Sequence, residues 1–320
     1  MAGSSAYAPL MPEPSKAVLI TGCSSGIGRA TALRLVRSGW RVYATARRPE
    51  AIAELEDAGC RTLALDVTSE PSMSAAVEEL ERAEGAVGVL INNAGYSQSG
   101  AIETVPIDAA RRQFETNVFG LVRLTQLVLP KMRAQRWGKI VNVGSMGGRL
   151  TFPGGGYYHA TKHALEAISD ALRFELRGFG IDVILLEPGL ITTDFGEAAA
   201  ASMSANSAHV TPAVDDPAVD DPYAQFNATV GAVTKGAYDG PLRRLGGGPE
   251  RVAKAIEKAL TRRRPPARIT ITPSAKLTIA TRRARATLPA PRFVPTSVIA
   301  AVPQPNITGD SSSSRREAMP

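Results

Sequence analysis

The stretch Val18-Leu19-Ile20-Thr21-Gly22-Cys23-Ser24-Ser25-Gly26-Ile27-Gly28 decides the fold of this chain. Its apolar start predicts a buried strand, and the glycines predict a tight turn that opens a helix. Backbone N–H groups at a helix start attract a pyrophosphate. A turn that serves packing alone is the alternative. We predict that the turn holds a dinucleotide, in contact with Gly22, Ser24, Ser25, Gly26, Ile27 and Gly28.

Short apolar runs alternate with amphipathic segments along most of the chain. The runs are apolar at nearly every position, which is typical of strands buried on both faces of a parallel sheet. We expect strands at Ala17–Thr21, Arg41–Ala46, Thr62–Leu65, Val87–Ile91, Lys139–Val143, Asp182–Leu186 and Ala267–Thr272. We expect helices near 27–38, 50–58, 70–84, 107–133, 157–178 and 250–261. Strand and helix in alternation predict an α/β protein with a doubly wound parallel sheet.

The pattern predicts one folded domain with additions. Residues 1–15 read as a flexible leader, and 16–273 as the dinucleotide-binding catalytic domain. Within it, 194–248 follow the sixth strand as an inserted substrate lid, since a loop of this length is usually functional or disordered. Residues 274–320 carry prolines and arginine pairs without clear periodicity, so we expect a basic, poorly ordered tail. Truncation after residue 273 should leave activity intact if this tail is only appended.

The charge is unevenly distributed. The chain carries +7 overall, but residues 250–320 hold 14 Lys and Arg against 4 Asp and Glu. Arg262-Arg263-Arg264 and Arg282-Arg283-Ala284-Arg285 could contact nucleic acid or an anionic membrane. Solvated charge is the favoured reading, because no aromatic residues interleave to stack bases. We expect no nucleic-acid partner.

Other classes of protein fit poorly. The two cysteines, Cys23 and Cys60, form no metal-ligand spacing and no disulfide framework, and we expect no metal. Residues 1–15 show no basic start followed by an apolar stretch, so no signal peptide is expected. No apolar run is long enough for a membrane-spanning helix. These features together favour a cytoplasmic protein.

The end of the second strand predicts which dinucleotide binds. Enzymes that use NAD usually place an acid there for the ribose 2′-hydroxyl. This chain has Ala46-Arg47-Arg48 and no acid, so Arg47 or Arg48 could pair with a 2′-phosphate. NADP is therefore favoured over NAD, and solvated arginines are the alternative. Further cofactor contacts are expected after the third and fourth strands, at Asp66, Val67, Asn93, Ala94 and Gly95. Asn92 could border the cofactor or tie strands together.

Four polar residues are candidates for proton transfer. Tyr158 and Lys162 are four apart on a predicted helix and share one face. A nearby ammonium favours the phenolate, which lowers a tyrosine pKa from about 10. Ser145 ends the fifth strand, where ligands bind in such sheets. Asn117 interrupts an apolar helical stretch, which suggests a buried polar role.

Taken together, these motifs resemble the short-chain dehydrogenase/reductase family over residues 16–272. The resemblance rests on Thr21–Gly28, Asp66, Asn92–Gly95, Asn117, Ser145, Tyr158–Lys162 and Pro188–Thr193. It implies a Rossmann fold with Tyr158 as general acid/base, Lys162 lowering its pKa and binding the nicotinamide ribose, and Ser145 polarising the substrate oxygen. It also implies that Asn117 holds a water linking Lys162 to solvent. Contacts with the carboxamide are implied for Pro188, Gly189, Ile191 and Thr193.

The substrate is less well defined. Residues 42–50 and 91–103 look most like the 17β-hydroxysteroid and retinol dehydrogenase branch, which implies an apolar alcohol or ketone. Plausible wall positions, or simply core positions, are Met146, Phe152, Tyr157 and Phe195. The resemblance also suggests a homo-oligomer. A dinucleotide-binding redox sensor without turnover is the competing hypothesis, and an enzyme is favoured because all four reacting residues are present.

Overall fold

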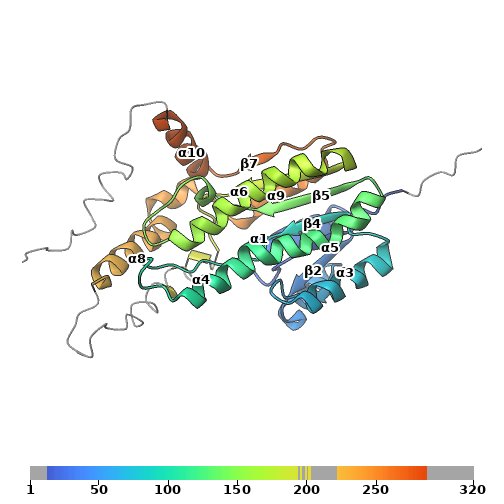
Figure 1. Ribbon diagram of the computed structural model, residues 1–320, viewed down its shortest axis with the longest axis horizontal. Helices are drawn as coiled ribbons and strands as arrows, with labels where there is room; N and C mark the ends of the chain where they lie inside the picture. Colours follow the sequence, from blue (N-terminus) through green and yellow to red (C-terminus); the bar gives the residue numbers. More distant parts are fainter. Residues whose placement is uncertain (1–12, 194, 197–198, 200, 203–221, 287–320) are drawn as a thin grey trace, which may run out of the picture.

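The structure is a computed structural model that describes residues 13–193, 195–196, 199, 201–202 and 222–286 (Figure 1). Its centre is a seven-stranded parallel sheet in the order β3-β2-β1-β4-β5-β6-β7. The predicted doubly wound α/β fold is therefore confirmed, and the strand ends differ from the expected ones by one or two residues in either direction. The strands are β1 Val18–Ile20, β2 Val42–Ala46, β3 Arg61–Ala64, β4 Val89–Asn92, β5 Gly138–Val143, β6 Ile181–Glu187 and β7 Arg268–Thr270.

Helices cover both faces of the sheet. They are α1 Gly26–Arg37, α2 Glu54–Asp57, α3 Glu70–Glu84, α4 Ile107–Phe114, α5 Gly120–Ala134, α6 Gly156–Leu176, α8 Ala224–Asp239, α9 Pro249–Leu260 and α10 Pro273–Ala286. Single turns are η1 Pro49–Ile52, η2 Glu115–Phe119, η3 Met146–Gly148, η4 Arg177–Phe179 and η6 Pro241–Leu245. No helix in the described part of the chain is long and apolar enough to cross a membrane.

The core has two layers because successive side chains of a strand point to opposite faces. In β1, Val18 and Ile20 face the cluster that contains α1 and α9. Leu19 faces the other way, into the cluster that contains α3, α5 and the end of α6. All three residues have no exposed surface, which explains the unbroken apolar pattern of the strand.

The single helix expected near 107–133 is interrupted. A five-residue π-helical turn, η2, separates α4 from α5 and contains Asn117. Turns of this kind are rare and occur mostly at functional sites. The insertion changes the direction of side chains on one side of the helix, so helical periodicity alone could not predict it.

The expectation of poor order from residue 274 is wrong for its first part. Residues 273–286 form α10, with Ala275 and Ile279 buried. The start of this helix is tied to the loop after β6: the backbone N–H of Gly189 donates to Thr272 Oγ1 at 3.1 Å, and that of Leu190 donates to Ser274 Oγ at 3.1 Å. These tertiary contacts order a segment whose sequence pattern is weak. Residues 287–320, most of the leader and 203–221 of the lid lie outside the described residues.

Candidate active site

One large cavity opens at the carboxyl edge of the sheet, where β1 and β4 are neighbours but their following helices cover opposite faces. This is the point at which doubly wound sheets bind ligands. The cavity encloses about 1240 Å³. Its wall includes most of the predicted cofactor residues, namely Gly22, Ser24, Ser25, Gly26, Ile27, Arg47, Asp66, Val67, Asn93, Ala94, Gly95, Pro188, Gly189, Ile191 and Thr193. Gly28 and Asn117 are not among its lining residues.

The glycine turn has a shape that side chains would block. Gly22 and Gly26 adopt φ values of +72° and +55°, in the left-handed region that glycine tolerates. A Cβ on Gly28 would lie 2.2 Å from the carbonyl oxygen of Gly22. Gly28 therefore allows α1 to pack closely against the turn. Its role is in packing, since it is not among the residues that line the cavity.

The start of α1 fits an anionic group. Ser25 precedes the helix and makes no capping hydrogen bond with its side chain, and the first turn holds no acid. The backbone N–H groups there lack intrahelical partners, as at every helix start, and the helix dipole adds positive potential. A dinucleotide pyrophosphate would satisfy both.

Hydrogen bonds lock the turn to the strand beside it. Asn93 donates from Nδ2 to the carbonyl oxygens of Thr21 and Gly22, both at 2.9 Å. Thr21 Oγ1 accepts from the backbone N–H of Asn93 and Ala94, both at 3.0 Å. Asn92 instead donates to Asn142 Oδ1 at 3.0 Å, so it ties β4 to β5. Thr21 was not singled out from the sequence as a tie, although its place at the strand end is a signal.

The adenosine end of the cavity carries a cation. Arg47 follows β2 and lines the cavity, whereas Arg48 does not. Asp66, after β3, accepts a hydrogen bond of 2.9 Å from the backbone N–H of Thr68 and also lines the cavity. No acid stands at the end of β2, where Ala46 is buried. Of the two arginines left open by the sequence, Arg47 is the one that lines the cavity.

The predicted reacting groups Ser145, Tyr158 and Lys162 meet in the same cavity. Withdrawal from water raises the pKa of the Tyr158 phenol above its ordinary value; its hydrogen bond with Ser145 opposes this and the nearby Tyr238 adds to it. Ser145 Oγ accepts from the backbone N–H of Gly147 at 3.0 Å, which leaves its hydroxyl proton free to donate. Tyr158 is therefore a protonated acid at neutral pH, beside a second donor.

Lys162 is held close to the Tyr158 ring. It is buried and donates from Nζ to the carbonyl oxygen of Val143 at 2.9 Å. Burial lowers the pKa of Lys162 from 10.5 to about 8. Its ammonium nitrogen lies 5.7 Å from the centre of the Tyr158 ring. An ammonium at that distance stabilises the phenolate left after proton transfer.

Asn117 supports the site from behind. Its side chain donates from Nδ2 to the carbonyl oxygen of Tyr96 at 2.9 Å and to Thr161 Oγ1 at 3.2 Å. Its Oδ1 accepts from the backbone N–H of Tyr96 at 3.1 Å. A Cβ on Gly95 would lie 3.1 Å from Asn117 Oδ1 and 3.9 Å from Lys162 Nζ, so this glycine keeps the space between them open. The side chain of Asn117 thus joins η2, the loop after β4 and α6.

The two adjacent tyrosines, Tyr157 and Tyr158, have different surroundings. Tyr157 packs with Val105, Ala109 and Ala110 and not against the cavity. Tyr158 faces the cavity, with its ring 5.3 Å from that of Phe195. The predicted wall positions Met146, Phe152 and Phe195 line the cavity, and Tyr157 is a packing residue.

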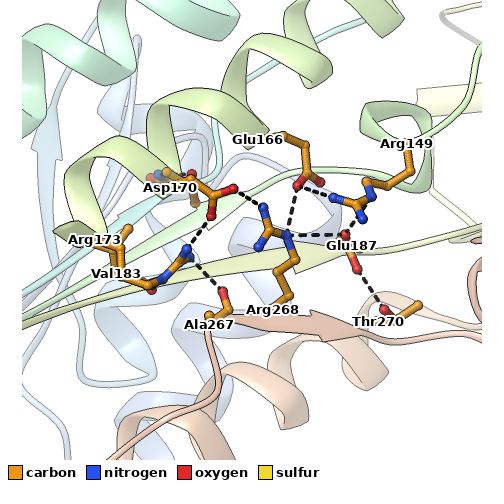
Figure 2. Close-up of polar contacts among 11 residues, drawn as sticks. Arg149, Glu166, Asp170, Arg173, Val183, Glu187, Ala267, Arg268 and Thr270 are labelled. Carbon is orange, nitrogen blue, oxygen red and sulfur yellow. Dashed lines mark hydrogen bonds and ion pairs between the residues drawn. The ribbon is translucent and has the colours of Figure 1, made fainter.

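A chain of partly buried ion pairs connects the segments around the site (Figure 2). Arg268 on β7 pairs with Glu166 on α6 at 2.9 Å and with Asp170 at 2.5 Å. Glu166 also pairs with Arg149, which follows the Ser145 turn, at 3.2 Å. Glu187 ends β6 directly before the Pro188 loop, and its Oε2 accepts from Thr270 Oγ1 at 2.7 Å.

The network therefore links the turn after Ser145, the helix α6 that carries Tyr158 and Lys162, and the end of β6 before the Pro188 loop. Arg149 and Arg268 also approach Glu187 Oε1 at 3.8 and 3.9 Å. Burial raises the pKa of Glu166, the hydrogen bond from Arg268 opposes this, and the charge of Glu187 raises it further. None of these residues was singled out from the sequence, because the pairs join positions far apart in the chain.

A sequence model of the family described as short chain dehydrogenase matches residues 16–204. The chain belongs to the short-chain dehydrogenase family. As a member it is an oxidoreductase that uses a nicotinamide dinucleotide and acts on CH–OH groups. The match covers the glycine turn and all four predicted reacting residues, and it stops before α8, α9 and α10.

Individual relatives agree with this assignment. A 3-ketodihydrosphingosine reductase from Bacteroides thetaiotaomicron is 43% identical over 179 residues, which cover 56% of this chain and 65% of the relative. An NADPH-dependent 3-dehydrocapnine reductase from Ornithobacterium rhinotracheale is 41% identical over 185 residues, covering 55% and 65%. The chain thus spans just under two thirds of the length of these two relatives.

The solved structures extend the likeness to the whole fold. The crystal structure of a short-chain dehydrogenase from Streptomyces avermitilis has a TM-score of 0.70 and 34% identity. The superposition covers 86% of this chain and 95% of that one. The likeness in fold therefore covers more of the chain than the match to the family model, which ends at residue 204.

Proposed function

We propose that this chain is an NADP-dependent oxidoreductase that interconverts an apolar ketone and its alcohol. The carrying observation is the meeting of Ser145, Tyr158 and Lys162 in one cavity that also reaches Arg47 and an apolar mouth. The competing function is a redox sensor that binds the dinucleotide without catalysing a reaction.

The proposed proton path uses residues already described. When bound, the dinucleotide supplies or accepts the hydride at the substrate carbon. The substrate oxygen would lie within reach of Ser145 Oγ and Tyr158 Oη, whose side chains hydrogen-bond each other. Tyr158 donates its proton to that oxygen during reduction, and Lys162 stabilises the phenolate that forms. Oxidation of the alcohol runs the same steps in reverse.

The preference for NADP rests on Arg47. Its guanidinium follows β2, lines the cavity and has no neighbouring acid at the strand end. Arginine binds phosphate through two parallel hydrogen bonds, a geometry that a 2′-hydroxyl cannot match. A relative named as NADPH-dependent supports the same preference.

The preference for an apolar substrate rests on the outer wall of the cavity. The apolar part of the cavity lining includes Phe152, Phe195, Val230, Val233, Leu242, Leu245 and Leu277. Such a wall binds hydrocarbon by removing it from water, at roughly 25 cal/mol for each Å² buried. The 3-ketodihydrosphingosine and 3-dehydrocapnine reductases among the relatives support a ketone.

Steady-state oxidation of NADPH and NADH tests the proposal. The panel would pair ketones with the same head and alkyl tails of increasing length, beside steroid and retinoid carbonyls. We expect kcat/KM to rise with tail length and to be higher with NADPH. Equal kcat/KM for short and long tails would contradict the apolar assignment. Tight NADPH binding without turnover on any carbonyl would favour the sensor.

A further inference from the structure

Three aliphatic side chains at the mouth of the cavity are about half exposed. Val233 on α8, Leu242 on η6 and Leu277 on α10 line the cavity, yet 49%, 54% and 58% of their surfaces are exposed. These three residues stand on the rim, with one side toward the cavity and the other toward solvent. Clustered exposed hydrophobic side chains mark interaction sites in soluble proteins.

The same rim is strongly basic. The elements α8, η6 and α10 together carry seven Lys and Arg and one acid, Asp239. The side chains of Lys235, Arg243, Arg244, Lys276 and Arg282 are exposed. These three elements therefore carry a clear excess of positive charge beside the mouth of the cavity.

The rim is built on anchored elements. Both α8 and α10 contact η6, and the two helices lie at one end of the molecule (Figure 1). Val230 on α8 and Ile279 on α10 are buried beneath them. The exposed side chains thus face outward from supported helices and keep their arrangement without a partner.

We infer that this rim docks the cavity mouth on an anionic lipid surface. Aliphatic side chains enter the boundary between headgroups and acyl chains, while surrounding Lys and Arg pair with lipid phosphates. Charge complementarity favours this occupant. A neutral apolar partner would leave the exposed Lys and Arg side chains of α8, η6 and α10 without opposite charges. A nucleic acid would match the charge, but its phosphate backbone offers no hydrocarbon to Val233, Leu242 and Leu277.

Docking in this orientation connects the bilayer to the reacting groups. An apolar substrate could pass from the lipid into the cavity without crossing water, and its oxygen would reach Tyr158 at the far wall. This consequence rests on the proposed function, since it requires an apolar substrate. The docking itself requires only the rim, and it can be measured without turnover.

Sedimentation of the full chain with vesicles tests the docking. Vesicles of phosphatidylcholine alone would be compared with vesicles containing phosphatidylglycerol. We expect binding to the anionic vesicles that weakens as salt rises. Arg243→Gln with Arg244→Gln should weaken it about 25-fold, at roughly fivefold for each charge lost. The matched control replaces Lys254 and Lys258, exposed on α9, with Gln and should retain binding.

A second readout locates the contact. Leu277→Trp places a fluorophore on the rim, and we expect its emission to shift to the blue when anionic vesicles are added. Turnover of a short, water-soluble ketone should be unchanged by the Arg243 and Arg244 substitutions, since neither side chain lines the cavity.

Three results would overturn the inference. They are equal binding to neutral and anionic vesicles, equal loss in both double variants, and binding of duplex DNA without binding of vesicles. If vesicle binding follows the rim charges but no ketone is turned over, the docking stands and the proposed function fails.

Discussion

The ammonium nitrogen of Lys162 lies 5.7 Å from the centre of the Tyr158 ring. Both groups have shifted pKa values, and in each the largest cause is loss of water: burial raises the pKa of Tyr158 and lowers that of Lys162 to about 8. Each shift favours the neutral form of its group, yet with a pKa of about 8 Lys162 is still mostly charged at pH 7. Cofactor and substrate meet a protonated tyrosine beside a cation that is ready to stabilise its conjugate base.

The pH dependence of the two reaction directions should be opposite. Reduction needs the protonated Tyr158 and should stay level through neutral pH, falling only in the alkaline range, whereas oxidation should rise with pH. Lys162→Met removes the cation, so the alkaline limb should move to higher pH and the rate of oxidation should fall roughly 100-fold. Initial rates across pH in both directions measure this. An unchanged limb in the variant would mean that Lys162 does not tune Tyr158.

Lys162 should also lower the stability of the fold. Its pKa falls from 10.5 in the unfolded chain to about 8 in the folded one, so the unfolded chain binds more protons between these values. The cost is therefore complete below pH 8 and disappears as pH rises toward 10.5. At pH 7, Lys162→Met should stabilise the protein by about 1–3 kcal/mol, the lost bond to Val143 offsetting part of the gain.

Urea unfolding at pH 7 and pH 10 checks the sign. The gain from Lys162→Met should be larger at pH 7, and Lys254→Met on the exposed face of α9 should show no such trend. A variant that is less stable than the parent at pH 7 and equal to it at pH 10 would contradict the account.

Arg47 should control the choice of cofactor. Arg47→Ala removes the group that lines the cavity after β2, so the Kd for NADPH should rise about 10–100-fold while that for NADH changes little. Arg48→Ala is the matched control, because Arg48 does not line the cavity. Equal losses for the two cofactors would remove Arg47 from phosphate recognition. Titration of cofactor fluorescence gives all the constants.

The ion-pair network should be sensitive to loss of its shared cation. Arg268→Met removes a cation shared by Glu166, which is mostly buried, and Asp170, whose side chain is 41% exposed, so we expect the free energy of unfolding to fall by about 1–3 kcal/mol. Adding Glu166→Gln removes one of the carboxylates that lost its partner, and should restore part of the lost free energy of unfolding. Urea unfolding of the single and double variants forms the cycle, and additive losses would mean that the pair is not coupled.

Two truncations should separate α10 from the residues after it. Ending the chain after Ala286 keeps the helix and should preserve kcat/KM for an apolar ketone. Ending it after Thr272 removes Ser274, Leu277 and Thr278 from the cavity wall, so we expect a raised KM and a lower Tm. Equal kcat/KM values for the two shortened chains would mean that α10 does not contribute to the active site.

The fold could be predicted because its signal is local. Strand β1 and the turn after it occupy eleven consecutive residues, 18–28. The buried strands are apolar at almost every position. Tyr158 and Lys162 lie four apart on one helix, so their proximity follows from helical geometry. The roles assigned to these residues stay predictions until the variants are measured.

What the sequence missed depends on distant contacts. The end of β7 and the start of α10 hydrogen-bond residues more than 80 positions earlier, Gly189 and Leu190, and Arg268 reaches Glu166 across 102 positions. The π-helical turn at Asn117 leaves no mark on composition. Neither kind of feature is visible to periodicity, and both shape the site.

The most direct test of the central claim is the rate of NADPH oxidation by a long-tailed ketone, measured for the parent chain and for Tyr158→Phe at equal saturation with cofactor. The account predicts turnover in the parent and a loss of about 100-fold or more in the variant, with the Kd for NADPH unchanged. Turnover that survives in Tyr158→Phe would contradict the assignment of Tyr158 as the proton donor, and with it the proposed mechanism.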